Sequence, residues 1–103
     1  MATKATRSAR PIMVLMDLLG RRWTLRILWE LHQHPGLTFR ALRERCADVS
    51  PSVLNTRLAE LRDARLIMLE DGYTLTPEGR ELGCLILPLY NWAEGHFGDA
   101  GGG

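Results

Sequence analysis

The chain has 103 residues, of which 46% are hydrophobic and 24% charged, a composition typical of one globular domain with a single core. No apolar run is as long as a membrane-spanning helix and the N-terminus lacks the apolar core of a signal peptide, so we expect a cytoplasmic protein with no membrane partner. The two cysteines, Cys46 and Cys84, match no metal-binding spacing, and their apolar positions in predicted helices predict buried free thiols.

The net charge of +1 is unevenly distributed along the chain. Residues 1–65 hold 12 of the 13 basic residues and 6 of the 12 acids, which gives +6, whereas residues 66–103 carry −5. An asymmetry of this kind is typical of a protein that binds a polyanion, and a solvated arginine-rich helical surface is the alternative.

The first half of the chain predicts three helices after a polar, mobile arm at 1–9. A proline at the first position and a glycine after the last delimit a helix over 11–19. A second helix follows Arg21 and Arg22, carries Trp23 in its first turn, and stops at the His-Pro-Gly sequence of residues 34–36. Thr38 then caps a short helix that runs to about Cys46.

The fourth helix begins with Ser50 as N-cap and Pro51 at the first helical position. Its apolar stripe recurs at helical spacing: Leu54, Leu58 and Leu61. The opposite face carries short or absent side chains: Ser52, Asn55, Thr56 and Ala59. A helix with a packed back and a small polar front fits the DNA major groove, and an ordinary amphipathic surface helix is the alternative. Together with the preceding helix it has the helix-turn-helix order.

The chain after residue 65 predicts a β-hairpin and one long helix. Residues 66–70 and 73–75 are strand-like, and Asp71-Gly72 between them is a strong two-residue turn signal, so the hairpin would form a wing. The last helix follows Thr76-Pro77 and runs to about Phe97, ahead of a flexible glycine-rich tail at 98–103.

This last helix is apolar nearly all round, and Pro88 is expected to kink it. Such a helix must be buried on more than one side, which predicts that it packs against a partner helix from a symmetry-related copy of the chain. The alternative is that it lies at the centre of the monomer core. The predicted fold class is mainly α with a small β-hairpin, a winged helix-turn-helix domain of five helices and a two-stranded wing over residues 10–97.

Four segments in order resemble the motifs of HxlR-type transcriptional regulators, which are related to MarR-type regulators. The segments are Gly-Arg-Arg-Trp-Thr-Leu-Arg-Ile-Leu at 20–28, Thr-Phe-Arg-Ala-Leu at 38–42, Val-Ser-Pro-Ser-Val-Leu-Asn-Thr-Arg-Leu-Ala-Glu-Leu at 49–61 and Leu-Thr-Pro-Glu-Gly-Arg-Glu-Leu at 75–82. The resemblance implies a dimeric winged helix-turn-helix protein that binds double-stranded DNA, most commonly as a repressor. It also implies a dimer built from the first and last helices, here through Ile12, Leu15, Leu85, Leu89 and Trp92.

The sequence departs from that family pattern at four places. Arg10 stands where some members carry a cysteine that senses oxidants, so that route is not supported, and Ser52 replaces a basic residue of the recognition helix. The wing is reduced to the Asp71-Gly72 turn. Arg65 replaces a capping glycine, at a cost of about 1 kcal/mol if its backbone is left-handed.

We expect DNA contacts from residues 50–57 and from the start of the preceding helix. The expected contact residues are Arg40, Ser50, Ser52, Asn55, Thr56 and Arg57. Asn55 suits adenine and Arg57 suits guanine or phosphate, whereas Arg40 is a candidate phosphate clamp. Arg57 lies at the flank of the apolar stripe, so an intramolecular pair with an acid is its alternative. Arg43 and Arg45 are expected to be solvated.

The remaining chemistry-bearing residues predict no enzyme. No catalytic set, phosphate-binding loop, cofactor motif or zinc signature is visible, and His32 and His34 are expected to contact a helix C-terminus rather than a metal. Trp23, Trp29 and Trp92 would either line a pocket for a small-molecule effector or, as their spacing favours, pack in the core. A winged-helix module for protein–protein interaction, working through the apolar last helix, is the alternative to DNA binding.

Overall fold

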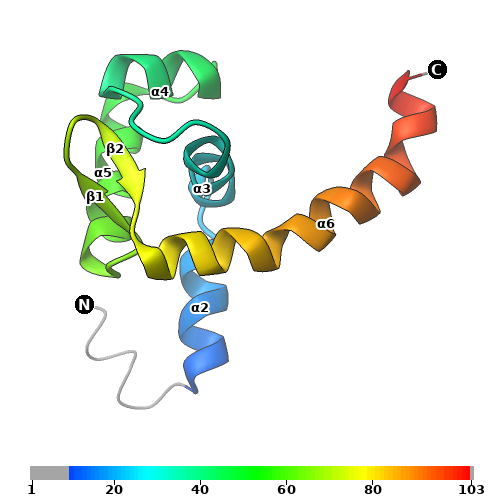
Figure 1. Ribbon diagram of the computed structural model, residues 1–103, viewed down its shortest axis with the longest axis horizontal. Helices are drawn as coiled ribbons and strands as arrows, with labels where there is room; N and C mark the ends of the chain where they lie inside the picture. The colour runs from blue at the N-terminus through cyan, green and yellow to red at the C-terminus, as the bar shows by residue number, and fades with distance from the viewer. Residues whose placement is uncertain (1–9, 103) are drawn as a thin grey trace.

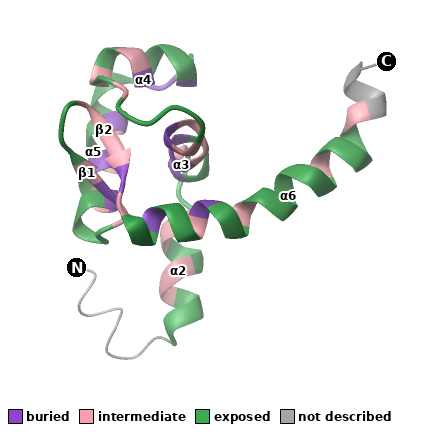
Figure 2. Ribbon diagram, viewed as in Figure 1, coloured by how far each residue is buried: buried purple, intermediate pink, exposed green. Residues whose placement is uncertain are grey.

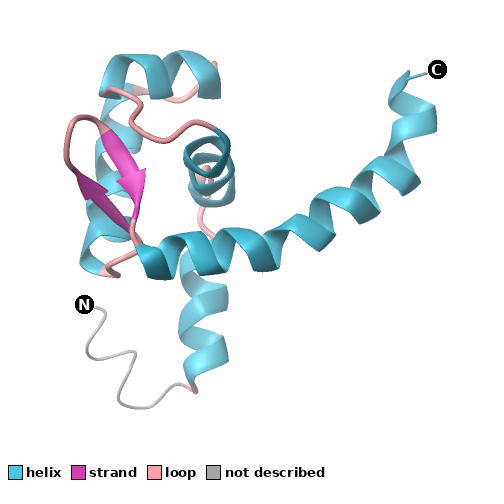
Figure 3. Ribbon diagram, in the orientation of Figure 1, coloured by secondary structure: helices cyan, strands magenta, loops and turns pink. Residues whose placement is uncertain are grey.

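The computed structural model describes residues 10–102, with side chains as far as residue 98. In this part of the chain five helices and one two-stranded sheet follow one another (Figures 1 and 3): α2 (Pro11–Leu19), α3 (Thr24–Gln33), α4 (Phe39–Cys46), α5 (Pro51–Asp63), β1 (Ile67–Leu69), β2 (Tyr73–Leu75) and α6 (Pro77–Gly102). The predicted fold class, mainly helical with one hairpin, is confirmed. The predicted arm at 1–9 lies outside the described residues.

Side-chain caps begin three of these helices. The Ala41 N–H donates to Thr38 Oγ1 at 3.0 Å at the start of α4, and the Val53 N–H donates to Ser50 Oγ at 3.2 Å at the start of α5. The Gly79 N–H donates to the hydroxyl of Thr76 at 3.0 Å at the start of α6. Each oxygen satisfies a backbone donor that has no partner within its helix, which confirms the three predicted boundaries.

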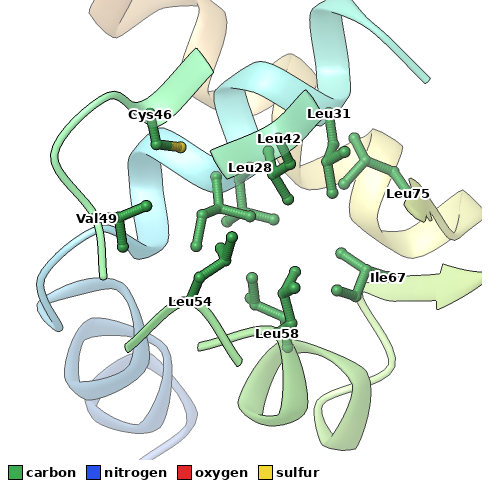
Figure 4. Close-up of a cluster of buried hydrophobic side chains, with 11 residues drawn as sticks. Leu28, Leu31, Leu42, Cys46, Val49, Leu54, Leu58, Ile67 and Leu75 are labelled. Atoms are coloured by element: carbon green, nitrogen blue, oxygen red, sulfur yellow. The ribbon is translucent and has the colours of Figure 1, made fainter. Parts of the chain in front are cut away.

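An apolar cluster contributed by α3, α4, α5, the hairpin and the connection between α4 and α5 forms the core (Figure 4). Its members are Ile27, Leu28, Leu31, Leu42, Cys46, Val49, Leu54, Leu58, Leu61, Ile67 and Leu75. The predicted stripe of α5 supplies three of them, so the opposite face of this helix necessarily faces solvent.

The hairpin is antiparallel and is tied to the connection between α3 and α4. Its turn residues Asp71 and Gly72 have φ values of 53° and 96°, as the predicted turn requires. The Tyr73 N–H donates to Leu37 O at 2.7 Å, and the Gly36 N–H donates to Tyr73 O at 2.9 Å. This added bridge, for which the sequence carries no local signal, fixes the wing against the body of the domain.

Two predicted helix boundaries are wrong. Trp23 is the N-cap of α3, with a left-handed φ of 80°, and not a residue of its first turn. Helix α6 continues to Gly102 rather than ending near Phe97, so the predicted tail is helical over 98–102. Glycine lowers helix propensity but, unlike proline, keeps its N–H for the backbone ladder. Pro88 lies inside α6, which curves along its length in Figure 1.

Helix α6 packs against the domain only along its first half. The side that faces the domain carries Gly79 and Gly83, both buried, with Leu82 and Ile86 packed against the core cluster. The second half extends away from the other elements and is mostly exposed (Figure 2). The alternative that places this helix at the centre of the monomer core is therefore wrong. Cys84 is exposed, contrary to the prediction, although its Sγ lies 4.0 Å from His32 Nε2 of α3.

Arg65 has a φ of 63°, the left-handed conformation in which glycine is favoured. We expect Arg65→Gly to raise the free energy of unfolding by about 1 kcal/mol, because it removes the clash between Cβ and the carbonyl oxygen. Urea denaturation measures this change. Arg62→Gly, three residues earlier in α5, is the control and should lower the same quantity by about 1 kcal/mol. A loss of stability in both variants would contradict the prediction.

Candidate nucleic-acid interface

The outward face of α5 presents four short polar residues, all exposed as predicted: Ser50, Ser52, Asn55 and Thr56. Three of them already make hydrogen bonds: Ser50 caps the helix, the hydroxyls of Ser50 and Ser52 lie 3.5 Å apart, and Thr56 Oγ1 donates to Ser52 O at 3.0 Å. Within the described residues the Asn55 amide has no hydrogen-bond partner. Its donor and its acceptor are free together, the combination that reads adenine in the major groove.

Arg57 is engaged within the molecule. Its Nε donates to Arg22 O at 2.8 Å, its Nη1 lies 3.2 Å from Glu60 Oε1, and its side chain is only 20% exposed. The open alternative, an intramolecular pair, is therefore what the structure shows, and the expected contact of Arg57 with guanine or phosphate lacks support. The reason is its place on α5, beside the buried leucine stripe and facing the connection between α2 and α3.

Two glutamates each join two arginines from different elements. Glu60 lies 3.2 Å from Arg57 and 3.1 Å from Arg21, which links α5 to the connection before α3. These pairs neutralise part of the positive charge of residues 1–65, so the sequence asymmetry overstates the cationic surface available to DNA.

The second network is centred on Glu30 in α3. Arg26 Nε lies 2.8 Å from Glu30 Oε2, and Arg45 Nε lies 3.2 Å from Glu30 Oε1, so α4 is tied to α3. Arg45 also contacts the ring of His34. The prediction that Arg45 is merely solvated is wrong, because Glu30 of the preceding helix α3 reaches its guanidinium.

Helix α4 also carries a cation that is more accessible than the paired arginines Arg45 and Arg57. The side chain of Arg40 is 90% exposed, and its nearest acid is Glu44, itself 70% exposed, at 3.6 Å. A pair this exposed is weak and easily exchanged for a phosphate. Arg43, in contrast, donates from Nε to Val49 O at 3.2 Å, so the expectation that it is only solvated is also wrong.

Arg62 is a further cation on the outward face of α5 and was not among the expected contact residues. It is exposed, it lies seven residues after Asn55 and hence on the same side of α5, and within the described residues it makes no ion pair. The helical period could have found it, because two turns bring residue 62 back above residue 55.

The wing contributes no cation to this surface. Residues 67–75 hold no lysine or arginine, and the exposed tip carries Glu70 and Asp71. Carboxylates at this tip would be repelled by phosphates, so the short wing is poorly suited to contact DNA.

Exposed apolar side chains also lie on α2 and on the outer side of α6, and we call these residues together the outer stripe. Leu85, Leu89 and Trp92 recur at helical spacing and are 69%, 61% and 60% exposed. On α2, Ile12 is 54% exposed and Leu15 is half-buried. The outer stripe thus contains the predicted dimer residues, with large apolar side chains facing solvent.

The three tryptophans have different environments. Trp23 packs against the core cluster, and Trp29 is half-buried and stacks on Tyr90 with ring centroids 4.9 Å apart. Trp92 stacks instead on His96 at 4.7 Å, on the exposed side of α6. Core packing is therefore the wrong interpretation for Trp92, which lies beyond the reach of the domain core.

The cysteines and histidines form no metal centre in the described part of the chain, where no three potential metal ligands from His, Cys, Asp or Glu converge. Burial raises the pKa of the Cys46 thiol, which disfavours its reactive thiolate.

Within residues 10–102, no helix combines the length and hydropathy that a bilayer-spanning segment needs.

Comparison with known proteins places this geometry in a family. A model of the HxlR-like helix-turn-helix matches residues 18–100. Quinone-bound YodB from B. subtilis is 28% identical with a TM-score of 0.73, over 81% of this chain and 94% of that one. The MarR family protein Rv2887 from Mycobacterium tuberculosis is 31% identical with a TM-score of 0.62, over 79% of this chain and 63% of that one.

A third structure, described as a possible HxlR family transcriptional factor from Thermoplasma volcanium GSS1, shares the fold with a TM-score of 0.74. It is 24% identical over 82% of this chain and 83% of that one. These neighbours are transcriptional regulators and not enzymes. The family model covers most of the chain, and we conclude that the protein belongs to the HxlR-like helix-turn-helix family of DNA-binding transcriptional regulators.

Proposed function

We propose that the protein is a sequence-specific repressor that binds double-stranded DNA as a homodimer and places α5 in the major groove. The outward face of α5 is the observation that carries this proposal. It combines short polar side chains, an Asn55 amide that has no hydrogen-bond partner in the part of the chain that the structure describes, and a back of three buried leucines. The proposal includes a cytoplasmic location, because a regulator acts in the compartment that holds its DNA.

The outer stripe supports the homodimer. Apolar side chains that are more than half exposed in one chain favour association, and a two-fold axis would bury the same surface on both copies. Such a dimer presents two copies of α5, and two half-sites double the phosphate contacts of one domain. Repression needs only that the bound dimer cover promoter DNA, whereas activation requires a further contact with the polymerase.

A winged-helix module for protein interaction is the second candidate. The engagement of Arg57 with Glu60 and Arg22, and the acidic wing tip, favour it because both weaken the surface for DNA. The two candidates differ in one measurement, the affinity for duplex DNA at low salt.

We expect Asn55→Ala and Arg40→Ala to weaken DNA binding in different ways. Asn55→Ala should lower affinity for a duplex selected from a random-sequence pool about tenfold and leave affinity for a scrambled duplex unchanged, because only base-edge contacts are lost. Arg40→Ala should weaken both duplexes and reduce the slope of log affinity against log salt by about 1, because one phosphate contact is lost. Fluorescence anisotropy over a salt series measures both.

Arg80→Ala is the control for the arginine, since Arg80 is exposed at the start of α6 and outside the proposed contact face. It should bind as the wild type does. If the folded wild-type dimer binds neither duplex at low salt and instead forms a defined complex with another protein, the interaction module replaces the repressor. If Asn55→Ala weakens both duplexes equally, Asn55 is not a base-reading residue.

A further inference from the structure

Helix α2 is held to the body of the domain by little apolar packing. None of its nine residues is buried, and the helix projects from the body on the side opposite α4 (Figure 1). Leu18 and Leu19, at its C-terminal end, pack against the core cluster and are partly buried. Because apolar contacts at one end of a helix leave its direction poorly fixed, the polar contacts near that end decide how α2 is oriented.

A chain of charged contacts joins α2 to α5 through the connection that precedes α3. Arg21 of this connection lies 3.4 Å from Asp17 of α2 and 3.1 Å from Glu60 of α5. Glu60 lies 3.2 Å from Nη1 of Arg57, whose Nε donates to Arg22 O at 2.8 Å. The Glu60 carboxylate thus holds two guanidinium groups, one from the connection and one from its own helix.

The pair between Glu60 and Arg57 differs from an ordinary surface ion pair. Both side chains are mostly shielded from solvent, whereas Arg40 and Glu44 of the pair on α4 are exposed. Lower exposure weakens solvent screening, so the shielded pair keeps its geometry more firmly. A carboxylate that is bound from two sides is also fixed in orientation, and it can therefore transmit the position of the connection to α5.

We propose that Glu60 is a positioning residue that sets the spacing of DNA half-sites accepted by the dimer, an inference that rests on the proposed function. Helix α2 contributes Ile12 and Leu15 to the proposed dimer interface, whereas α5 enters the major groove. Two symmetric copies of the Glu60 contacts would fix the distance and the angle between the two copies of α5. Without these contacts α2 tilts relative to α5, and the dimer, still held by α6, accepts more than one spacing.

A second network of the same kind provides a matched control. Glu30 also joins two arginines, Arg26 and Arg45, but these belong to α3 and α4. Glu30→Gln therefore removes the same charge and the same kind of ion pair without affecting the link between α2 and α5. An effect that Glu30→Gln shares with Glu60→Gln reports a general loosening of the domain.

The first test compares a selected two-half-site duplex with the same duplex lengthened by one base pair between its half-sites. This base pair turns one half-site by about 35° and moves it by about 3.4 Å relative to the other. The wild type and Glu30→Gln should bind the lengthened duplex at least about tenfold more weakly, whereas Glu60→Gln and Arg21→Gln should lose about threefold or less. Fluorescence anisotropy measures both affinities, and their ratio cancels any change in phosphate contacts.

The second test measures the spacing of the two recognition helices without DNA. Ala59 is exposed on the outward face of α5, so a spin label on Ala59→Cys reports one distance per dimer by double electron–electron resonance. The exposed thiol is removed by Cys84→Ser, and the other cysteine, Cys46, is buried. Adding Glu60→Gln should broaden the distance distribution, whereas adding Glu30→Gln should leave its width unchanged.

The inference is overturned if Glu60→Gln and Arg21→Gln keep the wild-type spacing penalty, or if Glu30→Gln reduces that penalty equally. In either case the proposed function stands, because the dimer still binds its selected duplex. If Glu60→Gln fails to fold, as judged by circular dichroism, Arg21→Gln decides the result alone. A wild-type dimer that binds neither duplex rejects the proposed DNA binding, and the label distances then decide whether Glu60 sets the spacing of α5. A wild type that gives no distance between labels rejects the homodimer and the inference together.

Discussion

Leu89→Glu is expected to convert the protein to a monomer and to lower its affinity for a selected DNA site at least about a hundredfold, because a bivalent contact becomes a monovalent one. Leu89 is 61% exposed in the single chain, so a charge there costs the monomer little. In the proposed dimer the same carboxylate would lie between two apolar surfaces without a counter-ion. Sedimentation equilibrium gives the oligomeric state, and fluorescence anisotropy gives the DNA affinity.

Leu69→Glu is the matched control. Leu69 is an exposed leucine of β1, 51% exposed, and it lies on the hairpin and not on the outer stripe. The Leu69→Glu variant should remain dimeric, and its circular dichroism spectrum should match that of the wild type. The homodimer would be rejected if wild-type protein sediments as one chain at micromolar concentration, and the interface would be misplaced if Leu89→Glu stays dimeric.

Elements whose signals are local could be predicted from the sequence. The caps at Thr38, Ser50 and Thr76 each depend on contacts within four residues, and the hairpin turn depends on two adjacent residues with positive φ. The buried stripe of α5 follows from the helical period alone, and it also fixes which face of α5 is exposed for the proposed DNA contact. These features can be predicted without knowing which residues from distant parts of the sequence lie nearby in the fold.

The environment of the cations could not be predicted in the same way. Arg57 meets the Arg22 carbonyl across 35 positions of sequence, and Arg45 meets Glu30 across an intervening loop. Such contacts depend on how helices are arranged in space. Counting charge along the chain therefore identified a basic segment but could not show that Glu30 and Glu60 compensate much of it.

The pattern of α6 was informative but ambiguous. Because α6 has apolar residues on all sides, the pattern required that more than one face of the helix be buried. The pattern alone could not distinguish a helix at the centre of the monomer core from a helix that packs against a partner chain. The structure separates them, because Leu82 and Ile86 pack inward while Leu85 and Trp92 face solvent. For the same reason the apolar residues around Cys84 in the sequence wrongly predicted that its thiol is buried.

Gly79→Ala is expected to lower the free energy of unfolding by about 3 kcal/mol, at the upper end of the usual cost of overpacking. A Cβ at this position would overlap the Leu66 carbonyl oxygen and would lie 3.0 Å from its carbon and 3.3 Å from Leu75 Cβ. The Leu66 carbonyl cannot move aside freely, because it accepts the Thr76 N–H at 3.0 Å. The first turn of α6 would have to separate from the hairpin, which would also tilt the outer stripe relative to α5.

Gly95→Ala makes the same substitution in the same helix with the opposite expected sign. No atom lies within 4 Å of a Cβ built at Gly95, so only helix propensity changes and the free energy of unfolding should rise by about 0.5–1 kcal/mol. Urea denaturation of both variants in the Leu89→Glu background, at one protein concentration, keeps dimer dissociation out of the comparison. A gain of stability in both would show that the hairpin and α6 are not in close contact at Gly79. A loss in Gly79→Ala alone would establish the contact that sets the direction of α6, and with it the spacing between the two recognition helices of the proposed dimer.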